Sequence, residues 1–268
     1  MDKIKKGDLV GRISYGKDII FVVKNTKDKK NIILEGFFER IIANSDISDL
    51  QLIDKNEILY KESLKDYEIQ KQENRIEKNL VTGRILHLDG DKRYSEKSFK
   101  YYQKMGISAI VKNIPENKQP KMVYNLLKMY KPDILVITGH DGMFKKDYGY
   151  YDIYNYRNSK YFIATVKEAK RYEKDTNSDI VIFAGACQSY FEALMQAGAN
   201  FASSPARILI DILDPLIVAK RVAVTSKDKY IRIEDLENEL RDGRRGVGGT
   251  GAWREKKKID CNISVIKM

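Results

Sequence analysis

The sequence has 268 residues, of which 43% are hydrophobic and 32% are charged, and its formal net charge is +11 at pH 7. This composition excludes a disordered chain and fits a soluble folded protein with one large domain or two modest ones. No apolar run approaches the about 20 residues that span a bilayer, and the charged start at residues 1–6 has no apolar export segment, so we expect no membrane partner.

The cysteines and histidines are too few and too scattered for a structural metal site. Cys187 and Cys261 exclude a disulfide framework and indicate a reducing, cytoplasmic compartment. Together with His87 and His140 they lack the C-x-x-C or H-x-x-x-H spacing of a zinc site, so we expect no metal and no cofactor. Most of the excess basic charge falls in residues 81–268, but without a nucleic-acid-binding motif it argues for a basic surface.

Residues 1–60 predict a small β module. Short apolar segments separated by Gly, Lys and Asn turns lie at residues 8–16, 18–23 and 31–36. Such spacing is typical of a small barrel, and we expect an SH3-like one. Residues 61–80 are charged and contain no proline or glycine, which indicates a helical linker to a second domain at residues 81–268.

The second domain shows a repeated strand–helix rhythm. The predicted strands are residues 83–89, 107–111, 133–140, 179–187, 217–224 and 230–233, and the predicted helices are residues 94–105, 119–130, 159–173 and 188–197. This alternation predicts an α/β fold with a mostly parallel sheet flanked by helices on both faces. The basic, glycine-rich segment 241–251 matches no phosphate-binding loop, and we expect a mobile surface loop there.

Two of the predicted strands end on residues that suit nucleophilic catalysis, His140 and Cys187. Ligands bind beyond the carboxyl ends of parallel strands, so a thiol and an imidazole would meet at one edge of the sheet. That pair is the minimum equipment of a cysteine hydrolase, with Cys187 as nucleophile and His140 as the proton carrier. A helix starting at Gln188 would place its positive end near the sulfur and favour the thiolate.

The neighbours of His140 complete a candidate site. Glycines on both sides of His140–Asp141 suggest close approach to another backbone, and we expect the N–H groups of Asp141, Gly142 and Cys187 to stabilise an oxyanion. His87 is the only competing imidazole.

Two aspartates follow the first predicted strand of the second domain, at Asp89 and Asp91. They are turn residues by default, but they could also hold a metal, a phosphate or a cationic side chain. A metal-dependent hydrolase centred on His87, Asp89, Asp91 and His140 is therefore an alternative to the cysteine hydrolase. A non-catalytic basic scaffold or nucleic-acid-binding protein is a second one.

Longer motifs carry a family resemblance. Residues 138–142 (TGHDG) and 184–189 (AGACQS), with the histidine before the cysteine, resemble the caspase, gingipain, clostripain and legumain clan. The segments 86–91, 111–116 and 200–207 extend the resemblance over nearly the whole chain, to the YabG family of sporulation-specific cysteine peptidases. The resemblance implies a caspase-like fold and a thiol protease in the mother cell of a sporulating bacterium, associated with the forming spore coat. Such an enzyme cuts spore coat and related proteins after arginine.

The resemblance places the catalytic pair at His140 and Cys187 but leaves the arginine pocket open. Gly185 stands where some arginine-specific relatives carry an aspartate. We therefore expect the pocket carboxylate to come from Asp89 or Asp91, with Asp141 behind them. Self-processing is also conceivable, and candidate sites are Arg84, Arg207 and the Arg244–Arg245 pair.

Overall fold

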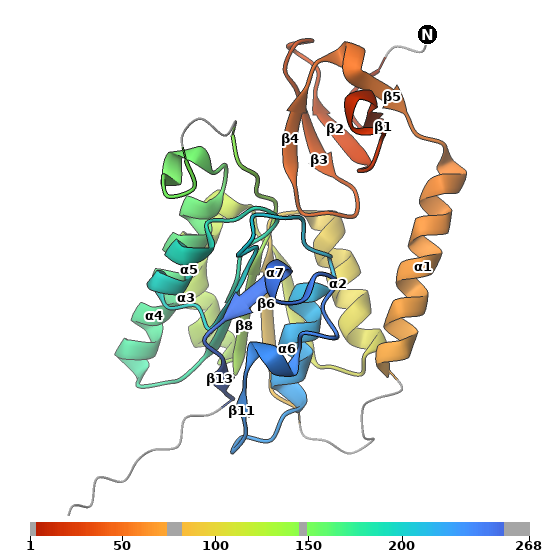
Figure 1. Ribbon diagram of the computed structural model, residues 1–268. Helices are drawn as coiled ribbons and strands as arrows, with labels where there is room; N and C mark the ends of the chain where they lie inside the picture. The colour runs from red at the N-terminus through yellow and green to blue at the C-terminus, as the bar shows by residue number, and fades with distance from the viewer. Residues whose placement is uncertain (1–3, 74–81, 145–148, 255–268) are drawn as a thin grey trace, which may run out of the picture.

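The computed structural model describes residues 4–73, 82–144 and 149–254, and it contains two main sheets (Figure 1). The first is an antiparallel five-stranded sheet in the order β4-β3-β2-β1-β5. Its strands are β1 Leu9–Arg12, β2 Phe21–Asn25, β3 Ile32–Gly36, β4 Ile42–Ser45 and β5 Leu50–Leu52. The three strands predicted for this module are confirmed, and two further strands, β4 and β5, complete it. Its likeness to an SH3 barrel stays a prediction.

A long helix connects the two sheets. Helix α1, Lys55–Glu73, begins earlier than the predicted linker and runs along the outside of the second domain beside helix α2, Lys92–Lys104 (Figure 1). Ion pairs join them, with 3.2 Å between Lys97 Nζ and Glu62 Oε1 and 2.8 Å between Lys104 Nζ and Asp66 Oδ1. The helix is therefore packed on the second domain, and the end of the predicted linker, residues 74–80, lies outside the described residues.

The second sheet has six strands in the order β12-β10-β9-β8-β6-β7. They are β6 Ile85–Asp89, β7 Ala109–Asn113, β8 Ile134–Thr138, β9 Val181–Ala184, β10 Phe201–Ser203 and β12 Val247–Gly249. All pairs are parallel except β10–β12. The α/β class predicted from the sequence is confirmed. The strand order reverses between β6 and β8, where open α/β sheets bind their ligands.

Helices cover both faces of this sheet and explain its continuous apolar strands. One face packs against α2 and α6 Asp214–Val224, and the other against α3 Gln119–Tyr130, α4 Ser159–Thr176 and α5 Phe191–Ala197. Alternate residues of each strand enter the two cores: Val136 lies in the first, whereas Leu135 and Ile137 lie in the second. Strands buried on both faces need apolar residues at every position.

Three sequence predictions about this domain are wrong. Residues 217–224 belong to helix α6 and not to a strand, because a short, mostly buried helix rich in Val, Ile and Ala has nearly the composition of a buried strand. The segment 241–251 is not a surface loop: it forms α7 Gly243–Gly246 and the edge strand β12. Cβ atoms at Gly248 and Gly249 would lie 2.8 Å from Phe191 and 2.3 Å from the Asn200 carbonyl oxygen, so these glycines allow the strand to dock.

The third error concerns the helix after Cys187, which begins only at Phe191, so no helix terminus adjoins the sulfur. A small two-stranded sheet of β11 Tyr230–Ile231 and β13 Ala252–Trp253 closes the described chain. Among residues 4–73, 82–144 and 149–254, no helix has both the length and the apolar character to span a membrane.

Candidate active site

The two predicted catalytic residues lie at the same edge of the main sheet. His140 follows β8 by two residues and Cys187 follows β9 by three, and both are buried. The five-stranded sheet sits over this edge, and its β3–β4 turn points into it (Figure 1). The site is therefore formed by both parts of the chain, which the sequence did not indicate.

The backbone amides of Asp141 and Cys187 converge on one oxygen atom. The carbonyl oxygen of Arg40, in the β3–β4 turn, accepts a hydrogen bond from Asp141 N at 3.1 Å and from Cys187 N at 3.3 Å. Two of the three N–H groups expected in an oxyanion hole thus point at a peptide carbonyl. The third, Gly142 N, donates instead to Asp141 Oδ1 at 2.9 Å. Paired amides held by a rigid loop suit the stabilisation of a developing negative charge.

Glycines let the His140 loop approach its neighbours closely. A Cβ atom at Gly142 would lie 2.4 Å from the carbonyl oxygen of Ile42, and one at Gly139 would lie 2.3 Å from Glu116 Oε1. Any larger residue at either position would displace the strand β4 or the Glu116 carboxyl. The predicted close approach to another backbone is therefore found at Gly142, whereas Gly139 makes room for the Glu116 side chain.

The carboxyl of Asp141 fixes the shape of the loop. It accepts hydrogen bonds from Gly142 N, Asn158 N, Ser159 Oγ and Ser189 Oγ. Although these bonds lower its pKa, burial dominates and raises it to about 6. Because the carboxyl is already fully engaged with α4 and the turn after Cys187, it is the weakest of the three candidates for binding an arginine side chain.

The Cys187 thiol lies in an apolar environment. It is completely buried and packs in the core of the N-terminal module with Val10 and Phe21. Its sulfur accepts a hydrogen bond from Ile210 N at 3.3 Å. Burial raises the thiol pKa to about 12, so the group is neutral here. The expected thiolate is therefore not supported in this conformation, because the N-terminal module shields the sulfur from water.

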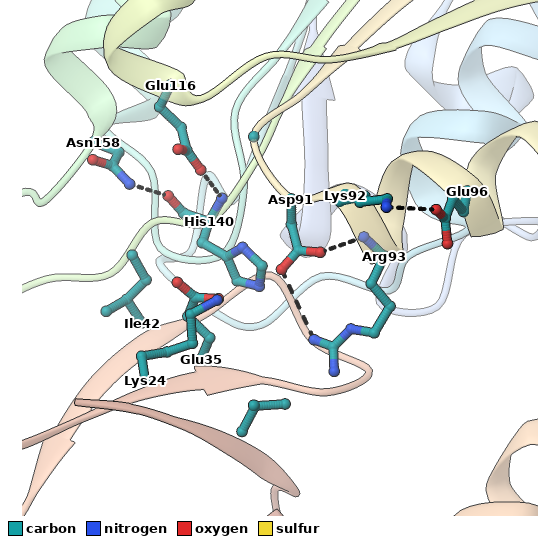
Figure 2. A pocket seen from close by; sticks show the side chains of 12 residues that line it. Lys24, Glu35, Ile42, Asp91, Lys92, Arg93, Glu96, Glu116, His140 and Asn158 are labelled. Atoms are coloured by element: carbon teal, nitrogen blue, oxygen red, sulfur yellow. Dashed lines mark hydrogen bonds and ion pairs between the residues drawn. The ribbon is translucent and has the colours of Figure 1, made fainter. Parts of the chain in front are cut away.

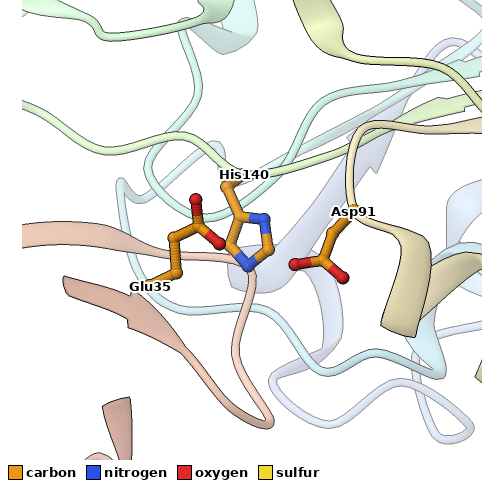
Figure 3. Close-up of side chains that lie close together, drawn as sticks. All are labelled: Glu35, Asp91 and His140. Carbon is orange, nitrogen blue, oxygen red and sulfur yellow. The ribbon is translucent and has the colours of Figure 1, made fainter. Parts of the chain in front are cut away.

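The His140 imidazole is buried between two carboxylates and a tyrosine. It lies between Glu35 and Asp91 (Figure 3), and its ring centroid is 5.0 Å from that of Tyr94. Burial lowers its pKa, so the ring is neutral, and its Nε2 has no hydrogen-bond partner among the described residues. Within the same residues no hydrogen bond joins it to Cys187.

His140 also borders an open cavity of about 620 Å³ (Figure 2). Its walls come from both parts of the chain, with Lys24, Glu35 and Ile42 on one side and Asp91, Glu116 and Asn158 on the other. His140 is thus the predicted catalytic residue that lines this cavity, whereas Cys187 is not part of its wall.

An unforeseen residue, Glu116, supports the His140 loop. Its Oε1 accepts the His140 backbone N–H at 2.8 Å, and it fills the space beside Gly90 and Gly139, where a Cβ atom would lie within 2.3 Å of it. Burial raises its pKa to about 7. In the sequence, Glu116 stood out only as the last residue of the family motif 111–116. A glutamate in a turn gives no sign that it will support the His140 loop.

Glu116→Gln is expected to remove part of the pH dependence of stability. The folded chain holds the Glu116 proton more tightly than the unfolded chain, so ionising this group costs stability as pH rises from about 4.5 to about 7. The glutamine variant avoids this cost. The difference in melting temperature, variant minus wild type, should therefore increase from pH 5 to pH 8. Glu96→Gln, at an exposed position of α2, controls for the lost charge. A constant difference across this range would contradict the assignment.

Asp89 provides a buried partner for a guanidinium group. Its carboxyl forms an ion pair with Arg40 Nη1 and also accepts from Thr138 Oγ1 at 2.9 Å and Asp91 N at 2.9 Å. Burial would raise the Asp89 pKa, but the charge of Arg40, then His87, and the hydrogen bonds from Asp91 N and Arg40 together hold it below its usual value. The Asp89 carboxylate is therefore ionised and suited to pair with a cationic side chain.

The remaining predicted residues have supporting positions. His87 is buried, with Nε2 2.6 Å from Thr138 Oγ1 and Nδ1 3.2 Å from the Tyr102 hydroxyl, and burial lowers its pKa to about 3. Asp91 caps α2 through Arg93 N at 2.7 Å. Within the described residues, the group that could share one metal ion is Glu35, Asp91 and His140. The four residues of the metal-hydrolase alternative therefore do not converge.

Comparisons with known proteins identify the family of the chain. The family model YabG peptidase U57 matches residues 5–258. The chain is also 37% identical to the sporulation-specific protease YabG of Bacillus subtilis (strain 168), over 91% of this chain and 93% of that protein. No solved structure matches. The chain therefore belongs to the YabG family of peptidases, the family of that sporulation-specific protease.

Proposed function

We propose that the protein is a cysteine endopeptidase that cuts after arginine. One observation carries the proposal: the amides of Asp141 and Cys187 hold the carbonyl oxygen of an arginine whose side chain pairs with Asp89. Carbonyl and guanidinium of the same residue are thus bound at the edge where the family resemblance places the catalytic pair. Asp89, and not Asp91 or Asp141, is accordingly the carboxylate of the arginine pocket.

The proposed reaction assigns a role to each of these residues. The Cys187 sulfur attacks the carbonyl carbon of the bound arginine, and His140 takes the thiol proton and gives it to the departing amine. The amides of Asp141 and Cys187 stabilise the oxyanion. Water then hydrolyses the thioester and restores the thiol. No cofactor takes part in this scheme.

The biological substrates are proposed from the family. The B. subtilis relative is named a sporulation-specific protease. We therefore place this enzyme in the mother cell of a sporulating bacterium, acting on spore coat and related proteins.

The test compares two peptides that differ in one charge. A fluorogenic peptide with arginine before the scissile bond should be cut at least about 100-fold faster, by kcat/KM, than the same peptide with citrulline. Citrulline has nearly the shape of arginine but no positive charge, so an ionised Asp89 would lose its partner. Equal rates for the two peptides would reject the proposed arginine pocket.

A further inference from the structure

We propose that the Arg40–Ile41 bond is a cleavage site within this chain, that the enzyme cuts it in cis, and that the intact β3–β4 turn closes the active site until then. The inference rests on the proposed function and adds the enzyme's own first substrate. It differs from the sites considered from the sequence, because Arg40 was not among them.

The backbone around Arg40 is bound as a substrate would be. Its carbonyl oxygen lies on the two amides of the oxyanion hole, and the preceding residue, Glu39, forms an antiparallel bridge with Asp211. After the bond, Ile42 N donates to the Asp141 carbonyl oxygen at 2.8 Å. The peptidase domain therefore binds the backbone on both sides of the Arg40–Ile41 peptide bond.

The Arg40 side chain fills the arginine pocket. It is completely buried, its Nη1 pairs with Asp89, and its guanidinium carbon lies 4.6 Å from the centre of the Tyr94 ring. Its Nε and Nη2 have no hydrogen-bond partner among the described residues. Burying a charged group with so few hydrogen bonds contributes little to the stability of the fold. Binding of Arg40 as a substrate residue therefore explains its position better than a role in stability does.

The bound turn also explains why the site is closed. Ile41 N donates to the Glu39 carbonyl oxygen at 2.9 Å, which makes Arg40 the tip of a tight turn. The Tyr94 hydroxyl lies 2.9 Å from the same Glu39 oxygen and fastens the turn to α2. Cys187 has no exposed surface beneath it. A second substrate can reach the sulfur only after this turn has left.

Arg84 and Arg207, two of the arginines considered as cleavage sites, are held differently. The carbonyl oxygen of Arg84 accepts from Asp133 N and Ile134 N at the opposite, amino end of the sheet. The side chain of Arg207 is bound to Glu192 and to the hydroxyl of Tyr156. Among the described arginines, the oxyanion-hole amides of Asp141 and Cys187 bond only the carbonyl of Arg40.

The cut balances as an ordinary hydrolysis. The Cys187 sulfur bonds to the Arg40 carbonyl carbon and its proton passes to His140. The bond to the Ile41 nitrogen breaks, and that nitrogen takes the proton and becomes a free amine. Water then cleaves the thioester, leaving a carboxylate on Arg40 and the thiol on Cys187. Strands β3 and β4 remain paired from Ile32–Ser45 to Glu35–Ile42, so the fragments stay together until they are denatured.

The experiment follows freshly purified full-length chain by denaturing intact-mass analysis, with an arginyl peptide assay in parallel. We expect fragments 1–40 and 41–268, formed at a rate that is unchanged over a tenfold range of protein concentration, and peptidase activity that rises with the same time course. Arg40→Gln should not be cut after residue 40, whereas Arg84→Gln, at an exposed arginine, should be cut like wild type. The wild-type fragment starting at Ile41 is a readout that does not depend on whether Arg40→Gln folds.

Failure of the two proposals looks different. If the peptide is cut while the chain stays intact at residue 40, or if the cut rate rises with protein concentration, the cis cleavage is overturned and the proposed function stands. If wild type cuts neither the peptide nor itself, the proposed function fails, and this inference fails with it.

Discussion

Cys187→Ala is expected to lower the turnover of an arginyl peptide to the background rate, a fall of at least about 10⁴-fold. In the proposed mechanism the sulfur forms the covalent intermediate, and alanine leaves nothing to replace it. The fold should persist, because the thiol sits in an apolar core and, among the described residues, its sulfur makes only weak hydrogen bonds to the Ile210 backbone. Turnover and thermal melting of the same preparation measure the two effects separately.

Cys261→Ala is the matched control, because it removes the chain's other thiol. It should retain wild-type turnover and wild-type sensitivity to alkylating reagents. Substantial turnover by a folded Cys187→Ala chain would contradict the proposed mechanism. It would direct attention to the group formed by Glu35, Asp91 and His140.

Asp89→Asn is expected to remove the preference for arginine. The variant keeps the shape of the side chain but loses the charge that pairs with the guanidinium in a buried pocket. Removing one partner of such a pair costs about 3–5 kcal/mol, so kcat/KM for the arginyl peptide should fall by a factor between about 10² and about 4,000. The citrulline peptide should be affected much less, and the ratio of the two rates should approach one.

Asp133→Asn controls for the loss of an aspartate elsewhere in the domain. Asp133 is a partly exposed residue before β8, bonded to the Arg84 backbone, and its replacement should leave the arginine-to-citrulline ratio unchanged. A wild-type ratio in Asp89→Asn would show that another group binds the guanidinium. The thermal stability of Asp89→Asn should be measured with this assay, because the intact variant buries Arg40 without its charged partner.

The sequence predicted most of the α/β domain because its strands carry strong local signals. Strand β8 is a continuous apolar run with a charged residue before it and glycine after it, and helix α3 was predicted with its observed bounds. The prediction at helix α6 failed for a related reason. When an element is buried on nearly all sides, its sequence loses the periodicity that distinguishes a helix from a strand. Only the surrounding layers decide between helix and strand there.

The meeting of His140 and Cys187 at one edge of the sheet could be predicted, whereas their surroundings could not. Strand ends identify His140 and Cys187, since the edge of a parallel sheet collects them. The proton state of Cys187 depends on the N-terminal module that covers it, which is a long-range contact without a local signal. Arg40 illustrates the same point, because only the packing of the two sheets brings its carbonyl to residues 141 and 187.

The most direct test of the central claim is peptide mapping by mass spectrometry after reaction with an arginyl acyloxymethyl ketone, an electrophile that alkylates the catalytic thiol of a cysteine peptidase. The reagent is added to wild type that has reached constant peptidase activity, and the citrulline analogue serves as the matched reagent. We predict one adduct, on the Cys187 sulfur, formed with the arginyl reagent and absent with the citrulline one. An active protein that carries no adduct on Cys187, or that reacts equally with both reagents, would contradict an arginine-directed cysteine peptidase.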